Sequence, residues 1–326
     1  MEKRMSKVRG FPEHPACLST GFKGLDYAIG GLRAGSITCF GSAPCRCREF
    51  VLCELALRAA ESGINVLFLS LEQRSQRVEN VFLALRSGVD PSGIAAYSLR
   101  KPSTEAAFGF DEHCAEPTEA QLKRMRLARE HMSDLPLKII DSPVQTLDDV
   151  RLSAENMRVG IGPEADMLVV INYLKLIPDY FDVYFDVGGM GSVGKDPSDT
   201  TRRIWDLKSE FARLSFELRA ISLGCNAPVV TSDWVSRRSR YHDLSTVEDY
   251  DFSYGLVKGA FFVDQDCDVL VSLDEVVSYE SDAVVDVKMR ILKNSYGGLL
   301  PVTIELSAPF LETEQIGCTI QGYGML

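Results

Sequence analysis

Short apolar runs alternate along this chain with longer polar and mixed stretches. The runs are rich in β-branched residues, and most are apolar at every position. That pattern is typical of strands in a parallel sheet that is covered on both faces. The predicted strands are Ile37–Phe40, Asn65–Leu69, Leu137–Ile140, Met167–Ile171, Pro228–Thr231, Asp268–Leu273 and Val284–Leu292.

Several of the longer stretches carry apolar residues every three or four positions, which is the period of an amphipathic helix. The clearest predicted helices are Glu49–Ala60, Thr118–Met132, Thr146–Asn156 and Arg202–Leu223. One face of the last helix holds Ile204, Leu207, Phe211, Leu214, Leu218 and Ile221. Strands that alternate with helices predict an α/β fold with a mostly parallel twisted sheet and helices on both faces.

Two connections are too long for simple turns. Residues 178–201 contain a glycine-rich segment, and residues 235–258 are polar and contain three arginines. Loops of this length in a compact domain are usually functional or disordered. Both are therefore candidate contact segments.

The composition is that of an ordinary globular chain. With 326 residues, 45% hydrophobic and 25% charged, the chain can bury the core of one large domain. No segment approaches roughly 18 uninterrupted apolar residues, and the basic start leads into polar sequence, so we expect neither a membrane span nor a signal peptide. Nine scattered cysteines fit reduced thiols, and we expect a cytoplasmic location.

The formal net charge of −11 argues against a surface dedicated to nucleic acid, because phosphate binding needs local positive potential. A basic channel on an acidic body stays compatible with this charge.

The first predicted strand runs into Gly41–Glu49, and a predicted helix follows. In an open parallel sheet, ligands bind beyond the carboxyl ends of the strands. A strand, a tight loop and a helix N-terminus at that edge can hold a phosphate through backbone N–H groups. The sequence therefore places a candidate phosphate site here.

Several short segments then appear in a specific order. They are Leu18–Asp26, Gly30–Gly35, Val66–Glu72, Leu168–Leu176, Asn226–Val230, Asp264–Val269 and Lys293–Asn294. Together they resemble the motor domain of DnaB-type replicative DNA helicases, a family of RecA-like P-loop ATPases. The resemblance implies a RecA-like P-loop NTPase fold over residues 18–310, with a short extension at 1–17 and a tail at 311–326.

The resemblance aligns the phosphate-binding motif of the family with residues of different chemistry. Its final Gly-Lys-Ser/Thr falls on Cys47, Arg48 and Glu49, and its first glycine falls on Ser42. A carboxylate about 4 Å from a phosphate charge costs about 4 kcal/mol at an effective dielectric constant near 20. That is roughly three orders of magnitude in affinity. The aspartate that supports magnesium in the family falls on Asn172, so we expect a degenerate nucleotide site.

Glu72 aligns with the glutamate that activates water in the family. It is the only candidate catalytic residue that the resemblance gives. The alternative reading is a solvated carboxylate or a helix cap, because a base without anchored metal or phosphate has nothing to activate. The arginine finger of the family falls on Ser295. We expect no metal and no cofactor, and ATP with magnesium would bind only if the atypical site functions.

In the helicase family, two loops line the DNA channel, and they correspond to the two long connections. The candidate DNA-binding residues are Lys195, Arg237, Arg238 and Arg240, although arginines in a polar loop are more often simply solvated. Aromatic residues among acidic ones in the first loop suit a protein contact, with packing on the domain itself as the alternative. Because only residues 1–17 precede the motor-like segment, a stable homohexameric ring is doubtful.

Cys39, Cys45, Cys47 and Cys53 form a cluster in sequence that raises the question of zinc. One lies in a predicted buried strand and another in a predicted helix, so four thiolates would hardly converge on a tetrahedron. Small buried side chains are the favoured reading.

These observations lead to three hypotheses. The first is an inactive relative of the helicase motor, a pseudo-ATPase that serves as a binding or regulatory module in DNA replication and docks on a replicative helicase, another replication protein or DNA. The second is an active ATP-dependent DNA helicase or ATPase with an atypical P-loop. The third is a structural scaffold that has lost both ligands.

Overall fold

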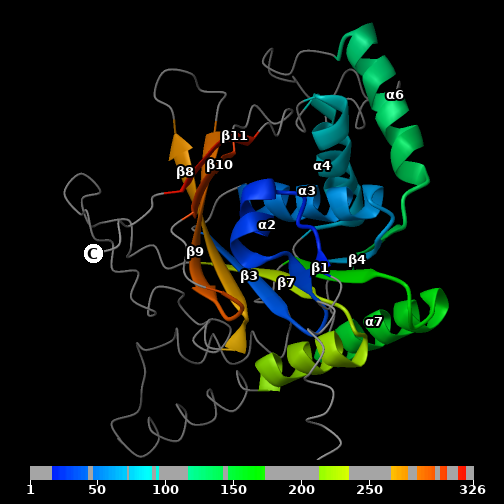
Figure 1. The fold of residues 1–326 in the computed structure, drawn as a ribbon. Coiled ribbons are helices and arrows are strands. Elements are labelled where there is room, and N and C mark those ends of the chain that lie inside the picture. The colour runs from blue at the N-terminus through cyan, green and yellow to red at the C-terminus, as the bar shows by residue number, and fades with distance from the viewer. Residues whose placement is uncertain are drawn as a thin grey trace, which may run out of the picture.

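The computed structural model describes residues 17–42, 47–71, 73–89, 93–94, 117–141, 146–172, 213–234, 266–277, 285–297, 302–306 and 315–320 (Figure 1). Within these residues the strands form one large sheet in the order β11-β10-β9-β8-β3-β7-β6-β4-β5. Its strands are β3 (Ile37–Ser42), β4 (Asn65–Ser70), β5 (Leu137–Ile140), β6 (Met167–Asn172), β7 (Val229–Trp234), β8 (Val269–Val277), β9 (Val285–Asn294), β10 (Val302–Leu306) and β11 (Gln315–Ile320). A small antiparallel pair, β1 (Cys17–Leu18) and β2 (Leu32–Arg33), precedes it.

The strands from β8 to β5 all pair in parallel, and β9, β10 and β11 extend the sheet with antiparallel pairing. The predicted fold class, a mostly parallel sheet, is therefore confirmed, as are the seven predicted strands. β10 and β11 were not predicted.

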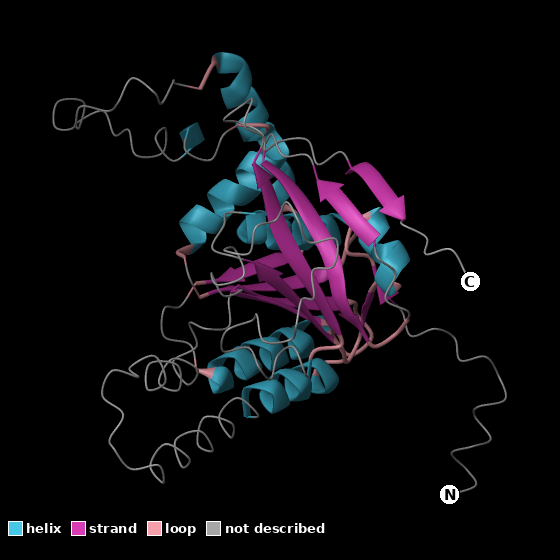
Figure 2. Cartoon of the chain, turned by 90° about the vertical axis from the view of Figure 1, so that its left-hand side faces the viewer, coloured by secondary structure: helices cyan, strands magenta, loops and turns pink. Residues whose placement is uncertain are grey.

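Helices cover both faces of the sheet (Figure 2). They are α2 (Lys23–Ile29), α3 (Cys47–Glu61), α4 (Ser75–Ser87), α6 (Glu119–Ser133) and α7 (Leu147–Ile161), with a further helix over residues 213–224. Among the described residues, each helix is too short or too polar to cross a bilayer.

The strands divide the core into two layers because successive side chains of a strand point to opposite faces. Phe40 and Phe68 pack on the α3 side together with residues of α2, α3 and α4. Cys39 and Leu69 pack on the other side with α7 and the helix over residues 213–224. The predicted apolar face of that helix is confirmed at Leu214, Leu218 and Ile221, all buried, and its other predicted residues lie outside the described part.

Local signals explain the ends of several helices. Thr118 and Thr146 form capping boxes at the starts of α6 and α7, near the predicted boundaries. α2 ends at Gly30, whose φ of 76° is the left-handed conformation that favours glycine. α4 was not among the predicted helices, although Val78, Val81 and Phe82 give it a buried face.

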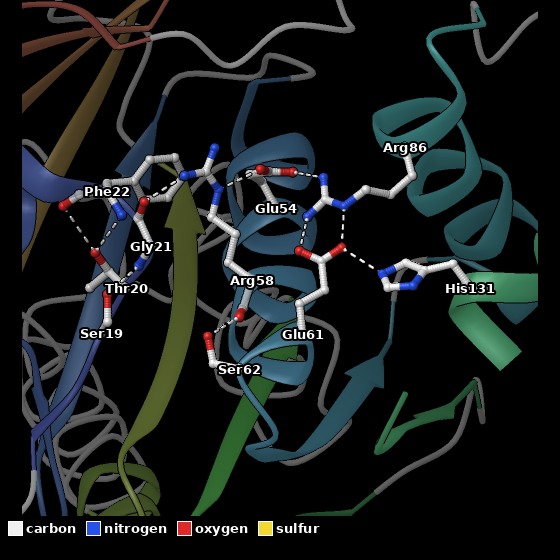
Figure 3. Close-up of polar contacts among 10 residues, drawn as sticks. All are labelled: Ser19, Thr20, Gly21, Phe22, Glu54, Arg58, Glu61, Ser62, Arg86 and His131. Carbon is white, nitrogen blue, oxygen red and sulfur yellow. Dashed lines mark hydrogen bonds and ion pairs between the residues drawn. The ribbon is translucent and has the colours of Figure 1, made fainter. Parts of the chain in front are cut away.

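A buried ion network ties α3 to α4 and α6 (Figure 3). The carboxylate of Glu54, whose side chain is 3% exposed, accepts hydrogen bonds from Arg58 Nε at 2.5 Å and Arg86 Nη1 at 2.7 Å. Arg86 also donates to Glu61, and His131 of α6 lies 3.4 Å from the same Glu61 carboxylate. Burial acts to lower the pKa of Arg86, but the bonds and charges of Glu61 and Glu54 outweigh it and raise the pKa.

Candidate functional site

A set of buried polar residues lies at the carboxyl ends of adjacent parallel strands. Ser42 ends β3, Ser70 ends β4, Asn172 ends β6 and Ser232 lies near the end of β7. Ser70 and Asn172 are aligned partners, and Ser232 Oγ lies 3.5 Å from Asn172 Oδ1. We call these four residues the carboxyl-edge cluster.

The carboxyl-edge cluster faces the helix that follows β3. The residues two positions earlier in the same strands are Phe40, Phe68, Val170 and Val230, and all of them pack in the core on the α3 side. Because strand side chains repeat with a period of two, the cluster continues the same face. The cluster therefore lies where the sheet, the β3–α3 connection and the start of α3 meet.

The first turn of α3 brings two charged residues to this region. Arg48 and Glu49 are 4% and 9% exposed. Gln73 Nε2 donates to Glu49 Oε2 at 3.3 Å, and Ser70 Oγ donates to the carbonyl oxygen of Gln73 at 2.6 Å. Glu49 is therefore bonded to the turn that follows β4, beside the carboxyl-edge cluster.

Two polar atoms of the carboxyl-edge cluster are buried without a hydrogen bond in the structure described: Ser42 Oγ and Asn172 Nδ2. A buried polar group without a partner costs about 1–3 kcal/mol. Most buried polar groups in native proteins have a hydrogen-bond partner. The few that lack one therefore often indicate a functional site. Here both sit at the sheet edge where ligands of parallel sheets bind.

The electrostatics of the region are mixed. The N-terminus of α3 and the guanidinium of Arg48 favour an anion. The Glu49 carboxylate opposes one, and the uncharged Asn172 supplies no negative charge for a magnesium ion. Within the described residues, no group of three or more His, Cys, Asp or Glu side chains could hold a metal ion.

The buried cysteines do not come together. Cys39 packs in the core on the α7 side, while Cys53 packs in the core on the α3 side. The sheet separates the side chains of these two cysteines; the side chains of Cys45 and Cys47 lie outside the described part. Burial, followed by the charges of Glu49 and Glu54, holds the pKa of the Cys53 thiol well above its usual range.

Cys53 should therefore resist alkylation. At about pH 8.5, where an ordinary thiol is partly ionised, iodoacetamide should modify the exposed Cys17 and leave Cys53 intact. Mass spectrometry of the digested protein measures both sites. Denaturation in about 6 M guanidinium should make them react alike, and equal reactivity in the native protein would contradict the burial of Cys53.

The structure thus places four of the predicted site residues, Ser42, Arg48, Glu49 and Asn172, at one end of the sheet. Glu72, Lys195, Arg237, Arg238 and Arg240, and the side chain of Cys47, lie outside the described residues. Sequence reasoning missed Ser70, Gln73 and Ser232. The signal that could have found the two serines is a polar residue at the end of an apolar strand.

A mostly parallel sheet with α3 following its central strand β3 agrees with the predicted RecA-like fold. The model of the DnaB-like helicase C-terminal domain matches residues 17–311. The chain belongs to this family. It is also similar to the replicative DNA helicase DnaB of Leifsonia xyli subsp. xyli (strain CTCB07), with 22% identity over 268 residues, 81% of this chain and 48% of that protein. The chain thus spans about half the length of this relative.

Solved structures show the same fold. A structure of a single ATPase domain superposes with a TM-score of 0.65 at 14% identity, covering 94% of this chain and 92% of that one. A DnaB-like replicative helicase, described with its interactions with primase, gives the same TM-score and identity and covers 94% of this chain and 64% of that one. At such low identity these similarities establish the fold alone.

Proposed function

We propose that this chain is a pseudo-ATPase of the DnaB-like family, which does not hydrolyse ATP and acts as a binding or regulatory module in DNA replication. The observation that carries the proposal is Glu49. Its carboxylate is buried in the first turn of α3 and accepts a hydrogen bond from Gln73.

A negative charge at this position opposes nucleotide binding directly. At about 4 Å from a phosphate charge, with an effective dielectric constant near 20, the repulsion is about 4 kcal/mol. The carboxylate also stands where the family's magnesium-binding hydroxyl is expected. Asn172, at the end of β6, removes the negative charge that would support the metal from the other side.

The family membership supports a role beside the replication machinery. The partner that fits best is a replicative helicase or another replication protein, with DNA as a further ligand through Lys195, Arg237, Arg238 and Arg240.

An active ATPase is the second candidate, and one observation favours it. Arg48 lies at the start of α3, where a phosphate would meet both the guanidinium and the helix N-terminus. In that case Glu72 would serve as the base that activates water.

Isothermal titration of the purified chain with ATP and a non-hydrolysable analogue, with and without magnesium, distinguishes the pseudo-ATPase from the active ATPase. The pseudo-ATPase predicts no heat at millimolar nucleotide. Magnesium-dependent binding in the micromolar range would reject it, and ATP hydrolysis that is lost in Glu72→Gln would establish the active enzyme.

A parallel titration with single-stranded oligonucleotide tests the binding role. Loss of binding in Arg237→Ala/Arg238→Ala/Arg240→Ala would support a DNA contact. A chain that binds neither nucleotide nor oligonucleotide, yet keeps its fold and a specific protein partner, would be a structural scaffold.

A further inference from the structure

The carboxyl-edge cluster and the turn after β4 hold buried polar atoms of opposite hydrogen-bonding character. Asn172 Oδ1 lies 3.5 Å from the hydroxyl of Ser232, and the Nδ2 donor of the buried Asn172 has no hydrogen-bond partner among the described residues. Gln73 has to turn its amide nitrogen to Glu49, since an ionised carboxylate accepts hydrogen bonds and does not donate them. The buried Oε1 acceptor of Gln73 is left without a partner in the part of the chain that the structure describes. The region therefore offers one unpaired donor and one unpaired acceptor.

Ser42 adds a hydroxyl that can both donate and accept a hydrogen bond. It ends β3 and lies on the same face of the sheet as Asn172, and its Oγ is buried without a hydrogen bond to any described residue. Buried polar groups in native proteins are normally paired. Three unpaired atoms in one region, beside the N-terminus of α3, therefore indicate a bound group.

The first turn of α3 supplies one buried charge of each sign, on Arg48 and Glu49. The ionised phosphates of a nucleotide are repelled by Glu49 and cannot donate a hydrogen bond to Gln73 Oε1. A simple cation is repelled by Arg48 and by the partial positive charge of the helix N-terminus, and it cannot accept a hydrogen bond from Asn172 Nδ2. A small ligand that carries both an anionic and a cationic group can satisfy all of these groups.

We propose that this region binds the zwitterion of a free amino acid. The carboxylate of the ligand accepts a hydrogen bond from Asn172 Nδ2 and is attracted by Arg48 and the N-terminus of α3. Its ammonium group donates to Gln73 Oε1 and is attracted by Glu49. This inference rests on the proposed function, because a chain that bound ATP and magnesium here would place phosphates in the same region. It goes further by giving the binding module a small-molecule ligand of its own.

Isothermal titration of the full chain with each of the common amino acids, without magnesium, tests the site. At least one of them should bind with a dissociation constant below about 10 mM. The amide of the best binder lacks the carboxylate, and its N-acetyl derivative lacks the ammonium group. Both derivatives should bind at least about tenfold more weakly than the parent amino acid. These two ligands are used with the unchanged chain, so their result does not depend on whether a variant folds.

Variants of the chain identify the atoms that hold the ligand. Gln73→Met removes the unpaired acceptor and Asn172→Leu the unpaired donor, and each should weaken binding of the amino acid at least about tenfold. Gln76→Met makes the same substitution at an exposed position of α4 and should leave binding unchanged. Glu49→Gln should also weaken binding of the amino acid, because the ammonium group loses the opposite charge, whereas the same variant should relieve the repulsion of ATP. Thermal unfolding checks that all variants fold.

A parallel titration with ATP separates failure of this inference from failure of the proposed function. A chain that binds neither ATP nor any amino acid would overturn the zwitterion site and leave the pseudo-ATPase standing, with ordered water satisfying the buried atoms. Equally tight binding of the best amino acid and its two derivatives would also overturn the site, as would unchanged binding in folded Gln73→Met and Asn172→Leu. Micromolar, magnesium-dependent binding of ATP by the unchanged chain would reject the pseudo-ATPase and the zwitterion site together.

Discussion

Glu49→Thr should convert a chain that gives no heat with millimolar ATP into one that binds it. The substitution removes a buried carboxylate from the first turn of α3 and restores a hydroxyl there. From the electrostatic cost of about 4 kcal/mol, affinity should rise by roughly three orders of magnitude. Isothermal titration with ATP measures the change.

Magnesium dependence should need more than this one residue. Adding Cys47→Gly, Arg48→Lys and Asn172→Asp restores three more of the family residues around the phosphates and magnesium, and binding should then depend on magnesium. Glu79→Gln on the exposed side of α4 makes the same charge change away from the site and should leave ATP binding absent. If only the combined variant binds ATP, Glu49 is not the main barrier.

Glu54→Leu should lower the free energy of unfolding by about 3 kcal/mol, because it leaves the largely buried Arg86 with fewer partners for its charge. Removing one member of a buried ion pair is costly, whereas replacing both by apolar residues is often nearly neutral. Urea denaturation should therefore show that the double variant Glu54→Leu/Arg86→Leu loses less free energy of unfolding than the two single variants lose together.

An exposed pair supplies the control. Asp148 and Arg151 lie 2.7 Å apart, with the Asp148 side chain 67% exposed, and Asp148→Asn should cost less than about 1 kcal/mol. If Glu54→Leu and Asp148→Asn lowered the free energy of unfolding by the same amount, the buried network would not contribute more to stability than an exposed ion pair.

Most of the fold could be predicted from the sequence, because its signals are local. Runs such as Met167–Ile171 are apolar on both faces, and only a strand covered by helices on both sides buries them fully. The capping threonines Thr118 and Thr146 mark helix starts through bonds to their own first turns. The order of the motifs identified the family, which its domain model confirms.

The same order of motifs identified Ser42, Arg48, Glu49 and Asn172 as candidate site residues. Each of them lies at the end of a strand or at the start of a helix. From the types of these residues we predict a degenerate nucleotide site. Whether it abolishes nucleotide binding stays a prediction, to be tested by titration.

Only the tertiary structure shows what these residues contact. Gln73 reaches Glu49 and Ser232 lies beside Asn172 because β4, β6, β7 and α3, distant in sequence, meet at one edge of the sheet. The same holds for the exposed side of α7: Leu152 and Val159 read as helix residues in the sequence, and only packing decides that they face solvent. A sequence specifies local conformation through short-range periodicity, but burial and contact between distant segments depend on how the elements pack.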